Sequence, residues 1–293
     1  MSRAERAAER VQFGFDALSE LYYRYWGEYF HLAIAEEGDD PKDLAACYER
    51  THRRYFEAIE GQSSKRILEV ACGGGAFAAW MAERTDGEVL GVDRSHTQLA
   101  HARRYASAER PNLRLRRWDA MELDRLDEPP FDAAVCLDAA CYFPDHMAVL
   151  LGIAKLLKPG ARLLFVDWCR AQQTTALQRE LILDPLCRLW AIRELETITG
   201  YVEALAGAGF RVRSVDDLSA PTAFNWDRGY RLALEALAER PPLSQLVRPV
   251  AGLALRGVSP LRLAKEQFQV ALLSKAAADA GVLRYVSFLA VRD

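Results

Sequence analysis

Residues 65–75 read KRILEVACGGG, an apolar run that ends in consecutive glycines. The run predicts a buried strand, and the glycines predict a tight turn into a helix, where a ligand can approach the main chain closely. A second apolar run, EVLGVD, ends in Asp93. A carboxylate about 20 residues after such a turn can accept hydrogen bonds from both hydroxyls of a ribose. Together the two segments predict a Rossmann-like unit that binds a nucleoside-containing ligand.

The glycine spacing leaves the class of nucleotide open, because Gly73-x-Gly75-x-x-Ala78 also satisfies the NAD and FAD fingerprint. Glu69 argues against a dinucleotide. It lies inside the first predicted strand, where a buried charge needs a partner such as the α-ammonium of a ligand that carries an amino acid. Asp119 follows a third predicted strand, where its carboxylate can accept from an adenine amino group. These two acids favour an adenosyl ligand with an amino-acid part over NAD.

The chain contains, in this order, the segments ILEVACGGG, VLGVD, WDAMEL, FDAAVCLDAACYF and LLKPGARLLFVDW. They resemble the successive motifs of class I S-adenosylmethionine (SAM)-dependent methyltransferases, over roughly residues 63–216 and the last dozen. The resemblance implies SAM as the cofactor, S-adenosylhomocysteine (SAH) as its product, and no required metal. One position departs from the family pattern. Ala71 stands in place of the first glycine, and we expect this small residue to change the turn slightly without abolishing binding.

The alternation of predicted strands and helices implies an α/β fold, a Rossmann-like and mostly parallel seven-stranded sheet with helices on both faces. Helical patterns outside this region predict a cap built from the N-terminus and from an insert before the last strand. We expect a helical lid over residues 1–62, the SAM-binding core over 63–216, a helical cap insert over 217–280, and a terminal strand over 281–293 that completes the core sheet. The other strands are expected near residues 65–71, 88–93, 112–118, 131–138, 161–168 and 210–216.

Local signals place several helix ends. In the lid, an aromatic stripe predicts a first helix, the GDDP segment breaks it, and a second helix follows over about 42–60. Ser95, with a glutamine three residues later, predicts a capping box. KPG at 158–160 predicts the end of the helix before the fifth strand. The last helix is expected to begin at Ser259 and Pro260 and to stop at Gly281.

The aromatic segment YYRYWGEYFHLA (22–33) carries a closer resemblance. It is similar to the YExGWGxSFHF-type segment of sterol C-24 methyltransferases, in a group that also contains cyclopropane synthases, tocopherol methyltransferases and natural-product C-methyltransferases. On that analogy the residues that line the acceptor pocket are Tyr22, Tyr25, Trp26 and His31. The alternative is that these residues are helix-packing aromatics and a histidine satisfied in the core.

Positions that match the family motif carry over its SAM contacts. Glu69 is expected to reach the methionine ammonium, and Asp93 to hold the ribose diol. The remaining expected cofactor contacts are Ala71, Gly73 and Gly75 in the turn, Arg94 beside the adenine, Asp119, Ala120 and Met121 at the adenine edge, and Leu137 at the methionine end. For Asp93 and Asp119 a structural interpretation stays open, because a helix dipole favours a carboxylate at the helix N-terminus.

Methyl transfer is an in-line displacement at an activated carbon, so much of the barrier is lowered by holding the reacting groups collinear. Asp138 ends the fourth predicted strand, where parallel-sheet enzymes place ligand-facing groups. It is the first candidate for the base or for an acceptor anchor; the alternative is a cap for the following loop. Tyr142 and His31 are the next candidates, since a histidine can titrate near neutrality. Asp167 and Trp168 end the fifth predicted strand. We expect them to form pocket wall; the alternative is a structural role.

Composition excludes several other classes. A net charge of −3 gives no basic footprint, and the three arginines of 114–117 are expected on a solvated strand face, so we expect no nucleic-acid partner. The six cysteines form no CxxC pair, which favours reduced, buried thiols over a metal site. The N-terminus MSRAERAAER lacks the apolar region of a signal peptide, and no apolar run approaches the roughly 20 residues of a membrane span. We therefore expect a cytoplasmic protein without a membrane partner. A homodimer stays open.

These features predict a SAM-dependent methyltransferase whose acceptor is a small, largely apolar molecule. We expect a terpenoid, a sterol-like compound or another natural product, methylated at carbon, because aromatic side chains can stabilise the cation that forms when an alkene is methylated. One alternative is N- or O-methylation of a small polar metabolite; the other is a SAM-binding cyclase or a homologue that transfers no methyl group. A pocket lined by Arg179, Arg188 and Arg193 would favour a polar acceptor, or the diphosphate of an isoprenoid.

Overall fold

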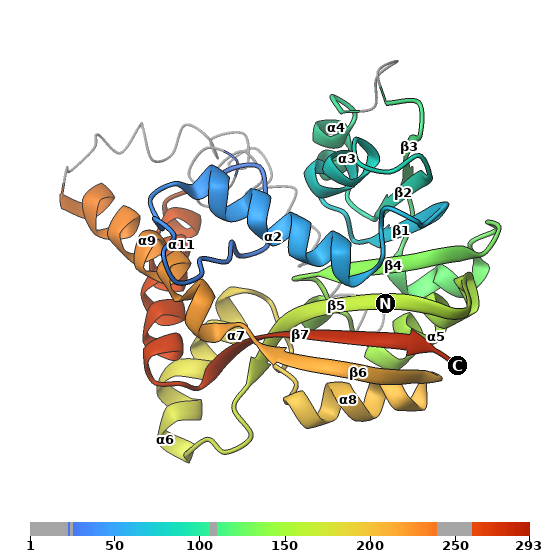
Figure 1. Cartoon of the computed structure of the whole chain (residues 1–293). Coiled ribbons are helices and arrows are strands. Elements are labelled where there is room, and N and C mark those ends of the chain that lie inside the picture. The colour runs from blue at the N-terminus through green and yellow to red at the C-terminus, as the bar shows by residue number, and fades with distance from the viewer. Residues whose placement is uncertain (1–22, 24–25, 106–109, 239–259) are drawn as a thin grey trace.

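The computed structural model describes residues 23, 26–105, 110–238 and 260–293 (Figure 1). The strands in these residues are β1 (Arg66–Val70), β2 (Glu88–Asp93), β3 (Leu113–Arg117), β4 (Phe131–Leu137), β5 (Leu157–Arg170), β6 (Phe210–Asp217) and β7 (Leu283–Arg292). The helices are α2 (Leu44–Ala58), α3 (Ala76–Ala82), α4 (His96–Ala102), η1 (Ala120–Arg125), η2 (Ala140–Tyr142), α5 (His146–Leu156), α6 (Ala176–Gln178), η3 (Arg179–Leu183), α7 (Asp184–Leu189), α8 (Ile198–Gly207), α9 (Ser219–Ala238) and α11 (Pro260–Asp279).

The strands form one seven-stranded sheet in the order β3-β2-β1-β4-β5-β7-β6. The pairs that join β1 to β5 are parallel, whereas β7 is antiparallel to both β5 and β6. This confirms the predicted mostly parallel seven-stranded sheet. The chain moves outward from β1 through β2 to β3 and then returns to the other side of β1, so the strand order reverses between β1 and β4. In open α/β sheets, ligands bind outside the carboxyl ends of the strands at such a reversal.

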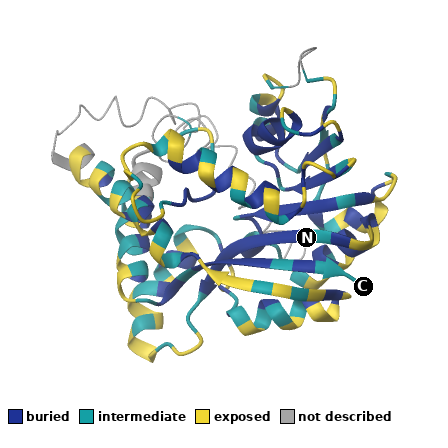
Figure 2. Cartoon of the chain, in the orientation of Figure 1, coloured by how far each residue is buried: buried dark blue, intermediate teal, exposed yellow. Residues whose placement is uncertain are grey.

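The central strands are buried on both faces, which explains why their sequences are continuous apolar runs. Neighbouring residues of β1 point to opposite sides, so Ile67 packs in one core with α2 and α3, and Leu68 packs in another with α5 and α8. Both side chains are fully buried. Figure 2 shows β1, β4 and β5 mostly buried, whereas the edge strand β6 is largely exposed. The helices therefore cover both faces, as predicted.

The structure differs from the sequence prediction at two boundaries. Helix α5 ends at Leu156, and KPG (158–160) lies inside β5, because Leu157 already pairs with Phe131 of β4. In the lid, α2 matches the second predicted helix, but residues 26–43 contain no helix. Several predicted residues lie outside the described part of the chain, namely the aromatic residues up to and including Tyr22, then Tyr25, and the predicted cap Ser259.

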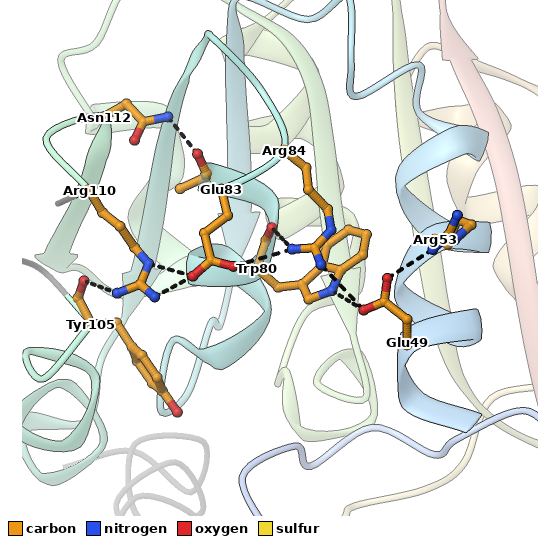
Figure 3. A network of polar contacts seen from close by, with 9 residues as sticks. Glu49, Arg53, Trp80, Glu83, Arg84, Tyr105, Arg110 and Asn112 are labelled. Carbon is orange, nitrogen blue, oxygen red and sulfur yellow. Dashed lines mark hydrogen bonds and ion pairs between the residues drawn. The ribbon is translucent and has the colours of Figure 1, made fainter. Parts of the chain in front are cut away.

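Helix α2 is attached to the core sheet through α3 (Figure 3). The carboxylate of Glu49 accepts a hydrogen bond from Trp80 Nε1 at 2.8 Å and lies 3.4 Å from the guanidinium of Arg84. Arg53 reaches the other oxygen of Glu49 at 3.1 Å. The Arg84 guanidinium also stacks over the Trp80 ring, 3.9 Å from its centroid. This network fixes α2 beside the strand that carries the glycine turn.

The predicted solvated arginines of β3 are paired with acids. Arg114 lies 2.5 Å from Glu88 and 2.9 Å from Glu128, and Arg116 lies 3.4 Å from Glu128. Arg66 of β1 joins the same two acids at 2.8 and 2.9 Å. Two of the three arginines of β3 are thus paired, and the two acids offset most of the charge of the three guanidinium groups around them. All six cysteines are free and buried. Among the helices that the structure describes, none has the length and apolar character needed to cross a bilayer.

The turn after β1 generates a prediction about stability. Ala71 has φ = 56°, the left-handed conformation that a glycine adopts at no steric cost. Such a conformation costs a residue with a Cβ about 1–2 kcal/mol. Glycine removes this strain but adds about 0.4–1 kcal/mol of conformational freedom to the unfolded chain. We expect Ala71→Gly to leave the free energy of unfolding in urea unchanged or to raise it by up to about 1 kcal/mol.

The matched control is Ala78→Gly, inside helix α3 and fully buried. A glycine in a helix interior costs about 1 kcal/mol relative to alanine. The control should therefore be clearly less stable than the parent. Equal losses in the two variants would show that the turn at Ala71 carries no strain.

Candidate active site

A pocket with about 880 Å³ of empty space opens at the carboxyl ends of β1, β2, β3 and β4, where the strand order reverses. Most of the residues predicted to bind the cofactor or to act on the acceptor line it, namely Ala71, Gly73, Asp93, Arg94, Asp119, Ala120, Met121, Leu137, Asp138 and Tyr142. The remaining lining residues are Phe30, Ser95, Gln98, Trp118, Ala139, Phe143 and Pro144. Residues far apart in the sequence thus form one cavity.

Asp93 connects the glycine turn to the start of α4. Its Oδ2 accepts from the Gly73 amide and its Oδ1 from the Ser95 amide, both at 2.8 Å. A Cβ on Gly73 would meet only Phe30 and Gln98 side-chain atoms, at 3.7 and 3.8 Å, so the space before this residue is open. Each carboxylate oxygen can accept more than one hydrogen bond. Asp93 is therefore held at the pocket wall and can still accept from a ligand.

Gly75 is placed differently from Gly73. A Cβ at this position would approach the Cβ of Ala102 on α4 to 2.8 Å, closer than real Cβ contacts come. Gly75 does not line the pocket. Its missing side chain lets α4 pack against the turn, so the residue shapes the site from behind.

Asp119 is a cap as well as a lining residue. Its Oδ1 accepts from the Met121 amide at 3.0 Å, at the start of η1, and its Oδ2 lies 3.6 Å from Arg94. The amide of Met121 is thus already hydrogen-bonded to Asp119. The structural and ligand-binding interpretations of Asp119 are compatible, because its two oxygens point to different partners.

Glu69 is buried behind the glycine turn, with 5% of its surface exposed, and it does not line the pocket. Burial, reinforced by the charge of Asp93, raises the pKa of its carboxyl from 4.5 to about 8. Its Oε2 has no hydrogen-bond partner within the described part of the chain. A buried carboxyl with an unpartnered oxygen is stabilised by a nearby cation. This environment fits a ligand that brings an ammonium group to the turn.

Asp138 ends β4 with φ = 51°, so the two strands beside the reversal both end in left-handed residues. Its Oδ1 accepts a hydrogen bond from the Tyr285 hydroxyl at 2.6 Å. Its Oδ2 is buried, and no described group is hydrogen-bonded to it. Burial raises the pKa of Asp138 well above its ordinary value, and the charge of Asp167 adds to this, while the Tyr285 hydroxyl acts in the opposite direction.

Asp167 does not form pocket wall. It is 0% exposed, and its oxygens accept from the backbone amides of Cys141 at 2.8 Å and Trp168 at 2.6 Å. Burial raises the pKa of its carboxyl to about 6. The role that this geometry supports is the structural alternative, because the carboxylate holds η2, which carries Tyr142, against the end of β5.

Three tryptophans gather at the end of β5. The Trp168 ring centroid lies 3.6 Å from that of Trp190 and 5.7 Å from that of Trp226 on α9. The indole N–H groups of Trp168 and Trp190 are buried and have no hydrogen-bond partner among the described residues. The Trp168 side chain is also a neighbour of Asp138, so this aromatic cluster lies close to that carboxyl.

His31 lies in a buried aromatic cluster and does not line the pocket. Its Nε2 is 2.9 Å from His52 Nε2, and the rings of Tyr48 and Phe77 lie 5.7 Å away. Burial lowers the pKa of His31 to about 3, so the imidazole is neutral near pH 7. This environment matches the alternative interpretation of a histidine satisfied in the core.

The segment 26–35, here called the strap, contributes Phe30 to the pocket and contacts the insert. Trp26 packs against α9, where the Arg228 guanidinium lies 5.3 Å from its ring centroid. Ala33 exchanges two hydrogen bonds with the Asn225 side chain, at 3.2 and 2.8 Å. Phe30 lines the pocket from the strap. The strap therefore contacts both the insert and the pocket.

Sequence patterns missed several of the residues that complete the site. Tyr23 donates to Gln98 Oε1 at 2.5 Å and lies against the glycine turn, where a Cβ on Gly74 would come within 2.2 Å of its hydroxyl. Tyr285 reaches Asp138 from the other end of the chain. The usable signals were an aromatic stripe near the N-terminus and a tyrosine in the terminal strand. Neither reveals its partner, because the contacts are non-local.

Chemically, the site combines an acceptor of hydrogen bonds at Asp93, a buried acid at Glu69 and a second buried acid at Asp138, at one edge of the sheet. The described residues bring no group of three or more histidines, cysteines or acids together in a way that could hold a metal ion. The arrangement can bind a polar nucleoside at one end and present a carboxyl to a second molecule at the other.

Comparisons with known proteins agree with this geometry. A family model described as a methyltransferase domain matches residues 67–160. Methyltransferase GfsG of Streptomyces halstedii is 27% identical over 210 residues, which cover 71% of this chain and 75% of that protein. Sterol 24-C-methyltransferase erg6 of Aspergillus fumigatus is 26% identical over 235 residues, which cover 75% of this chain and 60% of that protein.

Solved structures share the whole fold. The mycolic acid cyclopropane synthase CmaA1, complexed with SAH and CTAB, matches with a TM-score of 0.79 at 16% identity, over 97% of this chain and 98% of that one. The [4+2]-cyclase SpnF matches with a TM-score of 0.74 at 19% identity, over 97% and 96%. Together with the motifs and the pocket at the strand reversal, the domain match and the sequence relatives show that this chain is a SAM-dependent methyltransferase of the small-molecule type.

Proposed function

We propose that this enzyme methylates a small, largely apolar acceptor and that the methylated atom is carbon. The observation that carries the proposal is the environment of Asp138. A single buried carboxyl faces a part of the pocket lined by Leu137, Ala139, Phe143 and Phe30, next to the cluster of three tryptophans. Such a surface binds an apolar molecule and leaves one group to handle a proton.

SAM fits the nucleoside end of the pocket. The Gly73 backbone and Asp93 would hold the ribose, the Ala120 amide and Asp119 would face the adenine, and Leu137 would contact the methionine part. Glu69, buried behind the turn, would stabilise the ammonium through its charge. When bound, SAM supplies a methyl group on a positively charged sulfur, an activated electrophile.

The chain's own residues then have three tasks. The walls of the pocket align the acceptor and exclude water. The aromatic faces near Asp138 stabilise positive charge on the acceptor, at about 0.5–2 kcal/mol each. Asp138 takes up the proton that the acceptor loses, since a cation bound in the pocket favours the ionised form of this carboxyl.

The three arginines that would favour a polar or diphosphate-bearing acceptor do not lie at this site. Arg179, Arg188 and Arg193 are all exposed, and none of them lines the described pocket. Arg179 is also paired with Glu194 at 3.3 Å. One sequence relative is named as a sterol C-methyltransferase, and one protein with the same fold as a mycolic acid cyclopropane synthase. Both names support an apolar acceptor here.

Removal of the Asp93 carboxylate should weaken SAM binding. We expect Asp93→Ala to raise the Kd for SAM more than about tenfold, which is about 1.4 kcal/mol, because the variant loses the ribose acceptor and the link between the turn and α4. Isothermal titration calorimetry measures the change.

Asp132→Ala is the matched control for Asp93→Ala. Asp132 also accepts from two backbone amides, those of Lys65 and Arg66, but at the opposite end of the sheet. This variant should lose stability and keep the parental Kd. Unchanged affinity in folded Asp93→Ala would remove Asp93 from the cofactor site.

Glu69 should make stability depend on pH. Because its pKa rises from 4.5 to about 8 on folding, the folded state holds a proton in this range that the unfolded chain has released. Stability from this group is therefore full below about pH 4.5 and is lost as the pH rises through about 8. Glu69→Gln cannot ionise, so its urea midpoint should fall less than that of the parent between about pH 5 and 9.

The control for Glu69 is Glu57→Gln, an exposed position on α2 that should follow the parental pH profile. SAM should also stabilise the parent more than Glu69→Gln at about pH 9, since only the parent offers a charge to the ammonium. Parallel profiles for Glu69→Gln and the parent would contradict the assignment.

The proposed acceptor class is tested directly with methyl-labelled SAM. The enzyme is incubated with a panel of prenyl, sterol and macrocyclic acceptors and with small amines and alcohols, and the labelled atom is located by mass spectrometry and NMR. We expect label on carbon of an apolar acceptor. Label on nitrogen or oxygen of a polar metabolite would refute the proposal, and SAM binding without transfer to any acceptor would favour the cyclase alternative.

A further inference from the structure

Tyr285 lies at the active site because β7 is antiparallel to its neighbours in the sheet. β7 is antiparallel to β5, so its first residues, not its last, lie at the carboxyl edge of the parallel strands. Tyr285 pairs in register with Trp168 of β5, next to Asp167. It is 2% exposed and packs in the core that also contains Tyr55 of α2. A tyrosine near the end of the chain is thus built into the edge where the acceptor binds.

The Tyr285 hydroxyl makes the two oxygens of Asp138 unequal. It donates to Oδ1 at 2.6 Å, whereas Oδ2 is buried with no hydrogen-bond partner among the described residues. Asp138 lines the pocket, and Oδ2 is the oxygen of its carboxyl that no described donor satisfies. A donor fixed on one carboxyl oxygen orients the carboxyl and leaves its second oxygen for proton transfer. Enzymes commonly orient a general base in this way, through a hydrogen bond to the atom that does not take the proton.

The same hydroxyl connects the carboxyl to the strap. The backbone amide of Leu32 points to the Tyr285 oxygen at 3.4 Å, and the next strap residue is held by Asn225 of α9. The Tyr285 backbone holds the start of α9 as well: its amide donates to Ser219 Oγ at 3.0 Å, and its carbonyl accepts from the Leu218 amide at 2.8 Å. Strap and carboxyl therefore meet at the Tyr285 hydroxyl, and the insert is joined to the backbone of the same residue.

We propose that Tyr285 is the positioning residue of the active-site carboxyl, and that it couples the orientation of Asp138 to the closure of the strap over the pocket. The inference rests on the proposed function, in which Asp138 acts on the acceptor. The groups that face this carboxyl come from every neighbouring element: Tyr55 from α2, Asp167 and Trp168 from β5, Tyr285 from β7, and the Leu32 amide from the strap. Among these groups, Tyr285 makes the close hydrogen bond to Asp138, because its hydroxyl donates to Oδ1 at 2.6 Å.

The first test compares Tyr285→Phe with the parent. We expect kcat with the acceptor found in the panel to fall by at least about tenfold, while the Kd for SAH changes less than twofold, because the nucleoside end is untouched. Loss of the donor destabilises the ionised carboxyl, so the acidic limb of the pH profile should move to higher pH. The protonated-carboxyl band of Asp138 in infrared difference spectra, assigned by its absence in Asp138→Asn, should titrate at higher pH too. This readout needs no acceptor.

A second variant keeps the side chain's size and guards against a folding defect. Replacing Tyr285 with 3-fluorotyrosine makes the phenol a stronger donor, so the infrared titration and the acidic limb should move to lower pH, opposite to the effect of phenylalanine. Hydrogen exchange tests the coupling: SAH should protect the strap amides in the parent and protect them less in Tyr285→Phe.

The matched control is Tyr201→Phe. Tyr201 is equally buried, on α8 at the other face of the sheet, and its hydroxyl has no partner among the described residues. Its loss should leave kcat, the infrared titration and strap exchange at parental values. A Tyr285→Phe enzyme with the parental titration and parental strap exchange overturns the inference, whatever its melting temperature.

The variant Asp138→Asn distinguishes a failure of the inference about Tyr285 from a failure of the proposed role of Asp138. If it keeps SAH affinity and loses turnover while Tyr285→Phe behaves like the parent, Tyr285 is not a positioning residue and the role of Asp138 stands. If Asp138→Asn retains normal turnover, Asp138 is not the acting carboxyl, and the inference about Tyr285 falls with it.

Discussion

Two neighbouring parallel strands end in left-handed residues at the same edge of the sheet, and the site is built around that geometry. Ala71 ends β1 and Asp138 follows β4, with φ values of 56° and 51°. These conformations turn the chain sharply at the point where the strand order reverses, so the backbone of one turn and the carboxyl of the other face one cavity. Strained backbone of this kind persists only where the surrounding core holds it.

The opposite end of the chain closes this edge. Because β7 is antiparallel, the chain re-enters the sheet at the carboxyl ends of its neighbours, directly after the insert helix α11. The insert is therefore tethered beside the pocket at both of its ends, by β6 and by β7. The strap lies between the insert and the glycine turn and contacts both. The core sheet, the insert and the strap are thus parts of one packed structure.

The cofactor end of the site could be predicted from the sequence, whereas the acceptor end could not. Gly73, Asp93 and Asp119 occupy the pocket wall that their spacing implied, since a strand, a turn and a helix are local units whose geometry follows from a few residues. His31 was predicted from the resemblance of its segment and from its residue type, and Asp167 from its position at the end of the fifth predicted strand. The tertiary packing buries both, one in an aromatic cluster and one under backbone amides. The helix before KPG ends at Leu156, as that turn signal predicted, but the fifth strand already begins at Leu157, earlier than expected, because Leu157 pairs with Phe131 of β4.

By itself, the sequence determined the sheet, the order of its motifs and the pocket wall that follows β1, β2 and β3, because apolar runs and glycine turns dictate local structure through sterics and burial. Only the tertiary structure decided what holds the Asp138 carboxyl at the pocket. Tyr285 and Asp138 are separated by most of the C-terminal half of the chain, and the Leu32 amide comes from near the N-terminus. Their hydrogen bonds exist because a buried carboxyl needs partners and the fold brings these to it, a requirement that no local pattern encodes.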